Sequence, residues 1–78
     1  MTKVPIVKGK QVVSALSKAG WSVKSQKGSH VKLVKPGIEY HIVVASHGSS
    51  TIPVGTLSGI IKDAGLTVDE FVELLKRR

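Results

Sequence analysis

The tripeptide Gly28-Ser29-His30 is the part of this sequence best suited to chemistry. It stands where a glycine-containing turn becomes a strand, because apolar and polar residues alternate along 31–34. Backbone pairing would hold the histidine at an edge that a polyanion can reach, and Lys27 and Lys32 flank it. This arrangement predicts acid–base chemistry on phosphate esters.

Metal-free cleavage of RNA is the reaction that these residue types favour. The chain has no cysteine, and His41 and His47, six residues apart without an acidic cluster, match no standard zinc signature. In RNA, the 2′-hydroxyl can attack the adjacent phosphorus once a base removes its proton. An imidazole, with an unperturbed pKa of about 6.5, suits that role, which is worth roughly 10²–10⁴ in rate. Judged from chemistry alone, a surface histidine that caps a turn stays the alternative.

The charge of the chain is strongly asymmetric. Twelve lysines and arginines against five acids give a formal charge of +7, and Glu39 is the only acid before Lys62. A basic surface of this kind fits a nucleic-acid partner, since each neutralised phosphate releases counterions. The alternative is a basic protein that is merely soluble. The candidate RNA-binding residues are the lysines nearest His30: Lys24, Lys27, Lys32 and Lys35.

The length and composition of the chain predict one small domain over residues 1–78 with an aliphatic core. Hydrophobic residues make up 41% of the sequence and aromatic residues only 4%, so aliphatic side chains must build that core. No apolar run approaches the roughly 20 residues of a membrane-spanning helix, and no cleavable leader is recognisable. We therefore expect a soluble, cytoplasmic protein.

The apolar periodicity predicts an α+β fold with the order α-β-β-β-α, a further C-terminal helix and a three-stranded antiparallel sheet. Pro53 can open a helix, and Thr67 with Glu70 forms a capping box that begins the last one. The expected elements are a first helix from about 10 to 19, strands over 21–25, 30–34 and 38–43, a helix over 53–64 and a helix from 67.

The turn dipeptide Pro36-Gly37 predicts a tight hairpin between the second and third strands. With these two residues as the loop, Leu33 pairs with Tyr40 and Lys32 pairs with His41. His30, Lys32 and His41 would then share the sheet face that points away from the helices. Trp21 and Tyr40 are expected in the core.

The order of motifs along the chain adds a second line of inference. The motifs are Pro5-x-Val7-x-Gly9, Ala19-Gly20-Trp21, Gln26-Lys27-Gly28-Ser29-His30, Gly55-Thr56-Leu57, Ile60-Ile61-Lys62-Asp63-Ala64-Gly65-Leu66 and Thr67-Val68-Asp69-Glu70-Phe71. In this order they resemble the HicA family of bacterial toxins. The resemblance implies a double-stranded-RNA-binding-domain-like fold, mRNA cleavage with the Gly-Ser-His histidine as catalytic residue, and inhibition by a HicB antitoxin. Many members carry Pro-x-His after the third strand, whereas this chain has Ala45-Ser46-His47.

These observations together predict a metal-independent ribonuclease toxin of a type II toxin–antitoxin pair, with no cofactor. His30 is the expected general base or acid, Lys27 and Lys32 hold phosphate, and Ser29 donates a hydrogen bond. Gly28 and His47 are expected to support the site. One alternative is a non-catalytic RNA-binding module that uses the same basic face. An antitoxin-like DNA binder is a weaker alternative, because the chain has no helix-turn-helix pattern.

Overall fold

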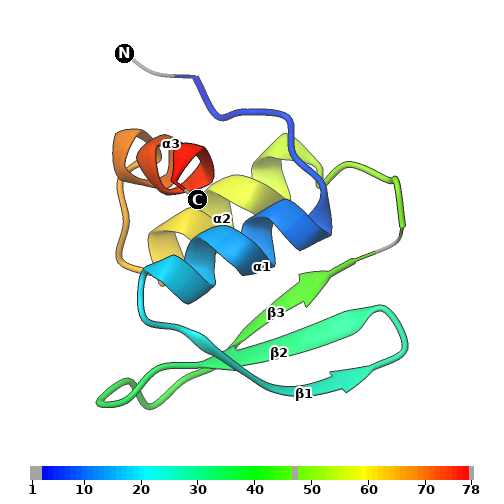
Figure 1. The fold of residues 1–78 in the computed structure, drawn as a ribbon, viewed down its shortest axis with the longest axis vertical. Helices are drawn as coiled ribbons and strands as arrows, with labels where there is room; N and C mark the ends of the chain where they lie inside the picture. Colours follow the sequence, from blue (N-terminus) through cyan, green and yellow to red (C-terminus); the bar gives the residue numbers. More distant parts are fainter. Residues whose placement is uncertain (1–2, 47, 78) are drawn as a thin grey trace.

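The computed structural model describes residues 3–46 and 48–77 and confirms the predicted α+β order. One helix precedes three antiparallel strands, and two helices follow them (Figure 1). The elements are α1 (Gly9–Lys18), β1 (Ser22–Lys27), β2 (His30–Val34), β3 (Ile42–Ala45), α2 (Val54–Asp63) and α3 (Val68–Lys76). Within the described ranges, no helix is both long enough and apolar enough to cross a bilayer.

The sheet has the strand order β1-β2-β3 and is covered by helices on one face only (Figure 1). Buried residues alternate along β2 and β3, so the side chains of Val31, Leu33, Ile42 and Val44 point toward the helices. α1 and α2 supply the opposing apolar side chains, among them Leu16, Leu57 and Ile61. The opposite face of the sheet is left to solvent.

The third helix packs on the other helices rather than on the sheet. Figure 1 shows α3 beside α1 on the side away from the strands. The predicted capping box is present, because Thr67 Oγ1 accepts from the Glu70 amide at 3.1 Å. Phe71 is fully buried, and the Lys18 ammonium of α1 donates to the carbonyls of Leu74 and Arg77 at the end of α3. α3 is therefore an integral part of the core.

The predicted pairing between the second and third strands is wrong by two residues. Leu33 pairs with Ile42 and Lys32 with Val43, whereas the sequence predicted Tyr40 and His41 as their partners. A shift of two residues keeps every side chain on its face, because the strand period is two. The apolar alternation therefore could not distinguish the two registers.

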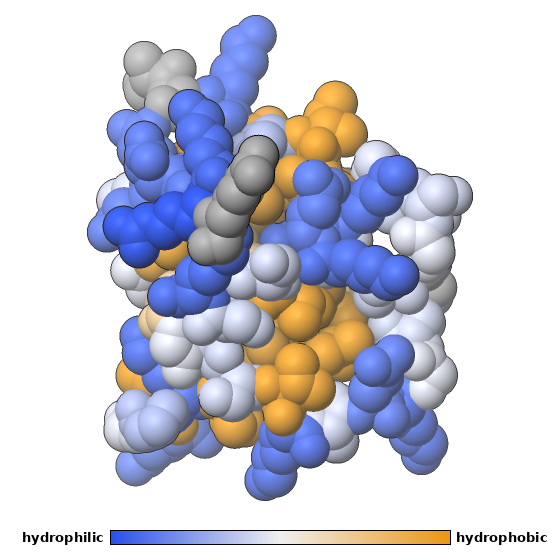
Figure 2. Space-filling model, viewed as in Figure 1, coloured by the Kyte–Doolittle hydropathy of each residue, from blue (hydrophilic) through white to orange (hydrophobic). Residues whose placement is uncertain are grey.

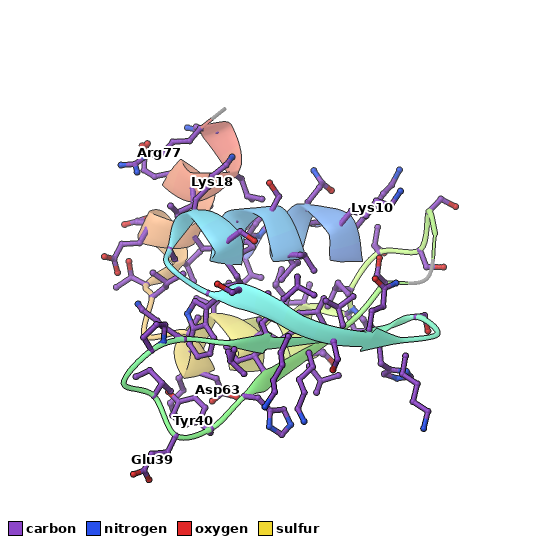
Figure 3. The ribbon with its side chains drawn as sticks, turned by 60° about the horizontal axis from the view of Figure 1, so that its bottom comes forward. Lys10, Lys18, Glu39, Tyr40, Asp63 and Arg77 are labelled. Carbon is purple, nitrogen blue, oxygen red and sulfur yellow. The ribbon has the colours of Figure 1, made fainter. Side chains whose placement is uncertain are left out.

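The segment between β2 and β3 is longer than a tight hairpin because Tyr40 is used elsewhere. Pro36-Gly37 does form a turn, closed by the Ile38 amide on the Lys35 carbonyl at 3.1 Å, but β3 begins only at Ile42. The Tyr40 hydroxyl donates to the Asp63 carbonyl at the end of α2, at 2.7 Å (Figure 3). Its ring lies 6.2 Å from that of Trp21. Trp21 is buried as expected, but Tyr40 is 53% exposed, so its assignment to the core was wrong.

The first strand is not half-buried, as its alternation had predicted. All six residues of β1 are exposed, and Val23 keeps 50% of its surface accessible. The strand lies at the edge of the sheet, and a bulge between Val23 and Ser25 makes Lys24 the extra residue. The helices do not reach far enough over this edge to bury Val23.

Candidate functional site on the open face of the sheet

The open face of the sheet brings His30 next to a lysine on the neighbouring strand. Lys27 of β1 pairs with His30 of β2, and His30 pairs with Ala45 of β3. Directly paired residues point to the same side of an antiparallel sheet, with Cβ atoms about 4.5–5.5 Å apart. Because Val31 is buried against the helices, His30 and its two partners face solvent. An imidazole and an ammonium group therefore lie side by side on an accessible surface.

A second row of the same face adds another ammonium group. Lys32 pairs with Ser25 on one side and with Val43 on the other. Lys32 follows His30 by two residues on the same strand, a spacing of about 7 Å. The two rows give His30 one lysine across the strands, Lys27, and one along its own strand, Lys32, and the neighbouring positions carry small or apolar side chains. A phosphate at His30 would thus meet positive charge from the adjacent strand and from further along β2. We refer to Lys27, His30 and Lys32 as the sheet-face cluster.

The β1–β2 turn holds the histidine by backbone geometry. Gly28 and Ser29 are the two loop residues between paired Lys27 and His30. Gly28 has a φ of 60°, whereas no residue other than glycine has a positive φ among those described, so the pair has the φ signs of a type II′ turn. The Ser29 carbonyl accepts a hydrogen bond from the Ser46 amide at 2.6 Å. The turn that joins β1 and β2 is therefore also fixed to the residue that follows β3.

The first turn of α1 packs closely on the end of β3, next to the strand that carries the histidine. A Cβ atom on Gly9 would lie 2.6 Å from Ser46 Cα and 2.7 Å from the Ala45 carbonyl oxygen. Ala45 is the cross-strand partner of His30, and Ser46 is the hydrogen-bond partner of Ser29. The absence of a side chain at position 9 thus lets α1 touch the strand end that holds the histidine.

Two other predicted site residues, and the predicted partner of Lys32, lie outside the sheet-face cluster. Lys24 is the exposed bulge residue of β1. Lys35 follows β2, about 16 Å of strand from His30, and its side chain lies near Gly20, just after the end of α1. His41 is exposed and precedes β3, so it is not the partner of Lys32. His47 lies outside the described residues, and its supporting role stays a prediction.

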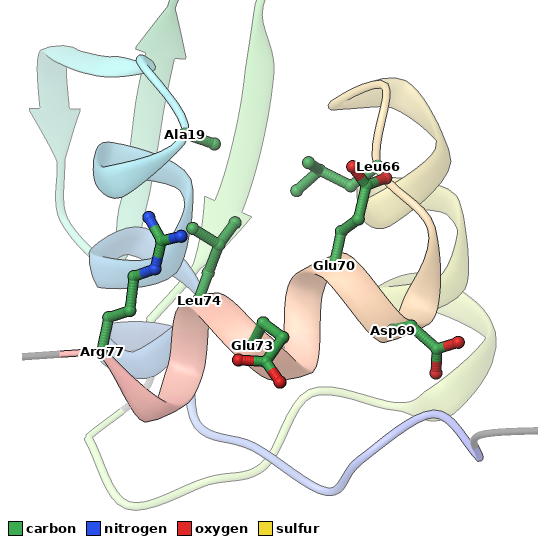
Figure 4. A pocket seen from close by; sticks show the side chains of 7 residues that line it. All are labelled: Ala19, Leu66, Asp69, Glu70, Glu73, Leu74 and Arg77. Carbon is green, nitrogen blue, oxygen red and sulfur yellow. The ribbon is translucent and has the colours of Figure 1, made fainter.

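A hollow lies beside α3, on the side of the helices that points away from the sheet. It has a volume of about 460 Å³, and its apolar walls are Ala19, Leu66 and Leu74. Figure 4 shows Arg77 on one side of the hollow and Glu70 on the other. Glu70 is engaged in the capping box, where its carboxylate accepts from the Thr67 amide at 2.8 Å. Asp69 and Glu70 lie in the first turn of α3, where their negative charge complements the helix dipole.

Comparison with known proteins gives the same family as the motifs. Residues 9–66 match the family described as the HicA toxin of bacterial toxin–antitoxin systems. The match covers well over half of the chain. The chain belongs to the HicA toxin family. No curated protein matches it.

The family match spans the elements that build the open face and excludes α3. It begins at Gly9, where α1 touches the end of β3, and it ends at Leu66, just before the last helix. The sheet-face cluster thus lies in the part of the chain that HicA toxins share. Among the described residues, no three histidine, aspartate or glutamate side chains gather as a metal site would require.

Sequence reasoning missed the residues that support the candidate site. Ala45 and Val43 flank the histidine and lysine of β2 only in the observed register. Gly9 was read as part of a motif, without its contact to β3. A glycine inside a helix lowers stability relative to alanine, so its presence at position 9 was a signal of a close contact there.

Proposed function

We propose that this chain is an endoribonuclease that cleaves mRNA and acts as the toxin of a type II toxin–antitoxin pair. The observation that carries the proposal is the sheet-face cluster, in which Lys27 lies across from His30 and Lys32 follows it on the same strand, all on the open face of the sheet. Membership of the HicA toxin family supports the toxin role. Because the proposed substrate is mRNA, this activity would take place in the cytoplasm.

The reaction follows from the groups on this face. His30 accepts the proton of an RNA 2′-hydroxyl, and the oxygen attacks the adjacent phosphorus. The bond from phosphorus to the 5′-oxygen breaks, and that oxygen takes up a proton from water as it leaves. Lys27 and Lys32 stabilise the negative charge on the phosphoryl oxygens, and Ser29 donates a further hydrogen bond. The products are a 2′,3′-cyclic phosphate and a 5′-hydroxyl.

Cleavage should survive removal of divalent ions, because His30 and two lysines supply the base and the positive charge. We expect equal rates with and without a chelator on a short labelled RNA. Mass spectrometry should identify a 2′,3′-cyclic phosphate or the monophosphate formed by its hydrolysis. Activity that disappears with the chelator and returns with magnesium or manganese would contradict this mechanism.

A non-catalytic RNA-binding module is the second candidate function. The same lysines on the open face of the sheet favour it, since phosphate contacts alone give binding without cleavage. Intact RNA after prolonged incubation with the pure protein would favour the module over the enzyme.

A HicB-type antitoxin that inhibits this toxin should compete with RNA for the sheet-face cluster. Reversing Lys27 and Lys32 to glutamate should weaken RNA binding and antitoxin binding together, each by at least about tenfold, because two charges change sign on one face and the net charge falls by four units. The salt dependence of antitoxin association should also decrease. Isothermal titration and stopped-flow association at two salt concentrations measure both effects.

The matched control reverses Lys3 and Lys62, which are exposed and lie outside the open face. It makes the same change in net charge and should have a much smaller effect on both partners. Loss of RNA binding by Lys27→Glu/Lys32→Glu with full antitoxin affinity would show that the antitoxin docks elsewhere.

A further inference from the structure

An apolar groove separates α1 from the exposed edge of the sheet. Figure 2 shows hydrophobic side chains gathered between α1 and the β1–β2 hairpin, with hydrophilic ones around them. The groove has a volume of about 190 Å³, and Val13, Val23 and Val31 form its floor. Its rim consists of Lys10, Gln26 and Ser46. Val23 pairs with Leu33 and so belongs to the helix side of the sheet, opposite to the sheet-face cluster.

The strand beside this groove is open to further pairing. β1 is an edge strand whose six residues are all exposed, and within the described residues it pairs with β2 alone. An edge strand presents a row of N–H and C=O groups that another extended segment can use. Such a segment would place alternate side chains over the groove and over the face that bears His30.

The charge around this edge indicates which kind of molecule can bind beside β1. Residues 1–38 contain no acid, and Lys10, Lys24 and Lys27 lie on or beside the edge. A second copy of this chain would bring like charges together at this edge. RNA would satisfy the lysines but not the valine floor. An extended protein segment with acidic and apolar side chains satisfies both.

We infer that the antitoxin adds an extended acidic segment to the edge of β1 and inserts an apolar side chain into the groove floored by Val13, Val23 and Val31. The inference rests on the proposed toxin–antitoxin pairing and names the way in which the partner is held. The lysines accelerate the encounter, and the groove lengthens the lifetime of the complex. A strand in this position also reaches the sheet-face cluster, because Lys27 belongs to β1.

The test separates charge from apolar contact by adding a positive charge to the groove. Val23→Lys should weaken binding of the purified antitoxin from the neighbouring reading frame by about 100-fold or more, although it makes the toxin more basic. Val54→Lys is the matched control, because Val54 at the start of α2 is 51% exposed and lies outside the groove. It should leave antitoxin affinity within about twofold. Both variants should bind RNA alike.

A milder variant and a backbone measurement complete the experiment. Val23→Thr keeps the β-branched shape and should reduce antitoxin affinity by about three- to tenfold. Hydrogen exchange should show new protection of β1 amides in the complex. Equal antitoxin affinity of Val23→Lys and Val54→Lys would contradict the insertion of an apolar side chain into the groove. Unprotected β1 amides would contradict the pairing of an antitoxin strand with β1. Loss of RNA binding in Val23→Lys alone would assign the groove to RNA instead. None of these binding readouts depends on RNA cleavage.

Discussion

Replacing His30 with alanine should abolish RNA cleavage and growth arrest while leaving RNA affinity nearly unchanged. His30 is the imidazole of the sheet-face cluster, and removing a general base typically costs 10²–10⁴ in rate. The side chain is exposed, so its loss should change thermal stability little. Single-turnover cleavage of a labelled RNA and titration of the same RNA measure the two quantities separately.

His41→Ala is the matched control for this experiment. His41 is also exposed, but it precedes β3 and is not paired with Lys32. We expect this variant to cleave RNA at nearly the normal rate. Undiminished toxicity of the His30→Ala variant would contradict the catalytic assignment and favour the RNA-binding module.

A methyl group at position 9 should destabilise the protein by about 3 kcal/mol, the upper part of the range for overpacking. The Gly9→Ala side chain would lie 2.6 Å from Ser46 Cα and 2.7 Å from the Ala45 carbonyl oxygen. Both are backbone atoms, which cannot rotate away, so α1 or the end of β3 must shift. Urea denaturation measures the loss, which corresponds to more than 100-fold in the folding equilibrium.

The same variant should also disturb the histidine, because Ala45 is the cross-strand partner of His30. The NMR signals of the His30 imidazole should move in the folded fraction. Gly59→Ala is the control, since Gly59 lies inside α2 with nothing within 4 Å of the added Cβ. It should stabilise the protein by about 0.5–1 kcal/mol. A Gly9→Ala variant as stable as the parent would show that α1 does not press on β3.

The local signals in the sequence predicted most of the fold. The capping box at Thr67, the proline before α2 and the glycine turn at Gly28 each act over a few residues, and all three appear as expected. The pairing of β2 with β3 depended on a distant contact, the bond from Tyr40 to the Asp63 carbonyl. Such a contact leaves no trace in alternation, so the register was misplaced by two residues.

In the candidate site, too, the residues that depend on local sequence were predicted, whereas the support that depends on tertiary packing was not. Lys27, His30 and Lys32 are close in sequence on one hairpin, and a strand period of two places them on one face without tertiary information. Lys35 was included because it is near in sequence, yet it lies at the far end of β2. The support from Gly9 joins residues 36 positions apart and required the packed structure.

The acid-bearing third helix gives the molecule an uneven distribution of charge. The three acids and three basic residues of 67–78 cancel, so residues 1–66, with nine lysines against Glu39 and Asp63, carry the whole formal charge of +7. The centre of charge is therefore displaced from the centre of mass, away from α3. Near a polyanion, this displacement produces a torque that turns the sheet toward the RNA before contact. Screening limits the torque to separations of about 8 Å at physiological ionic strength, so the chain is oriented during the final approach.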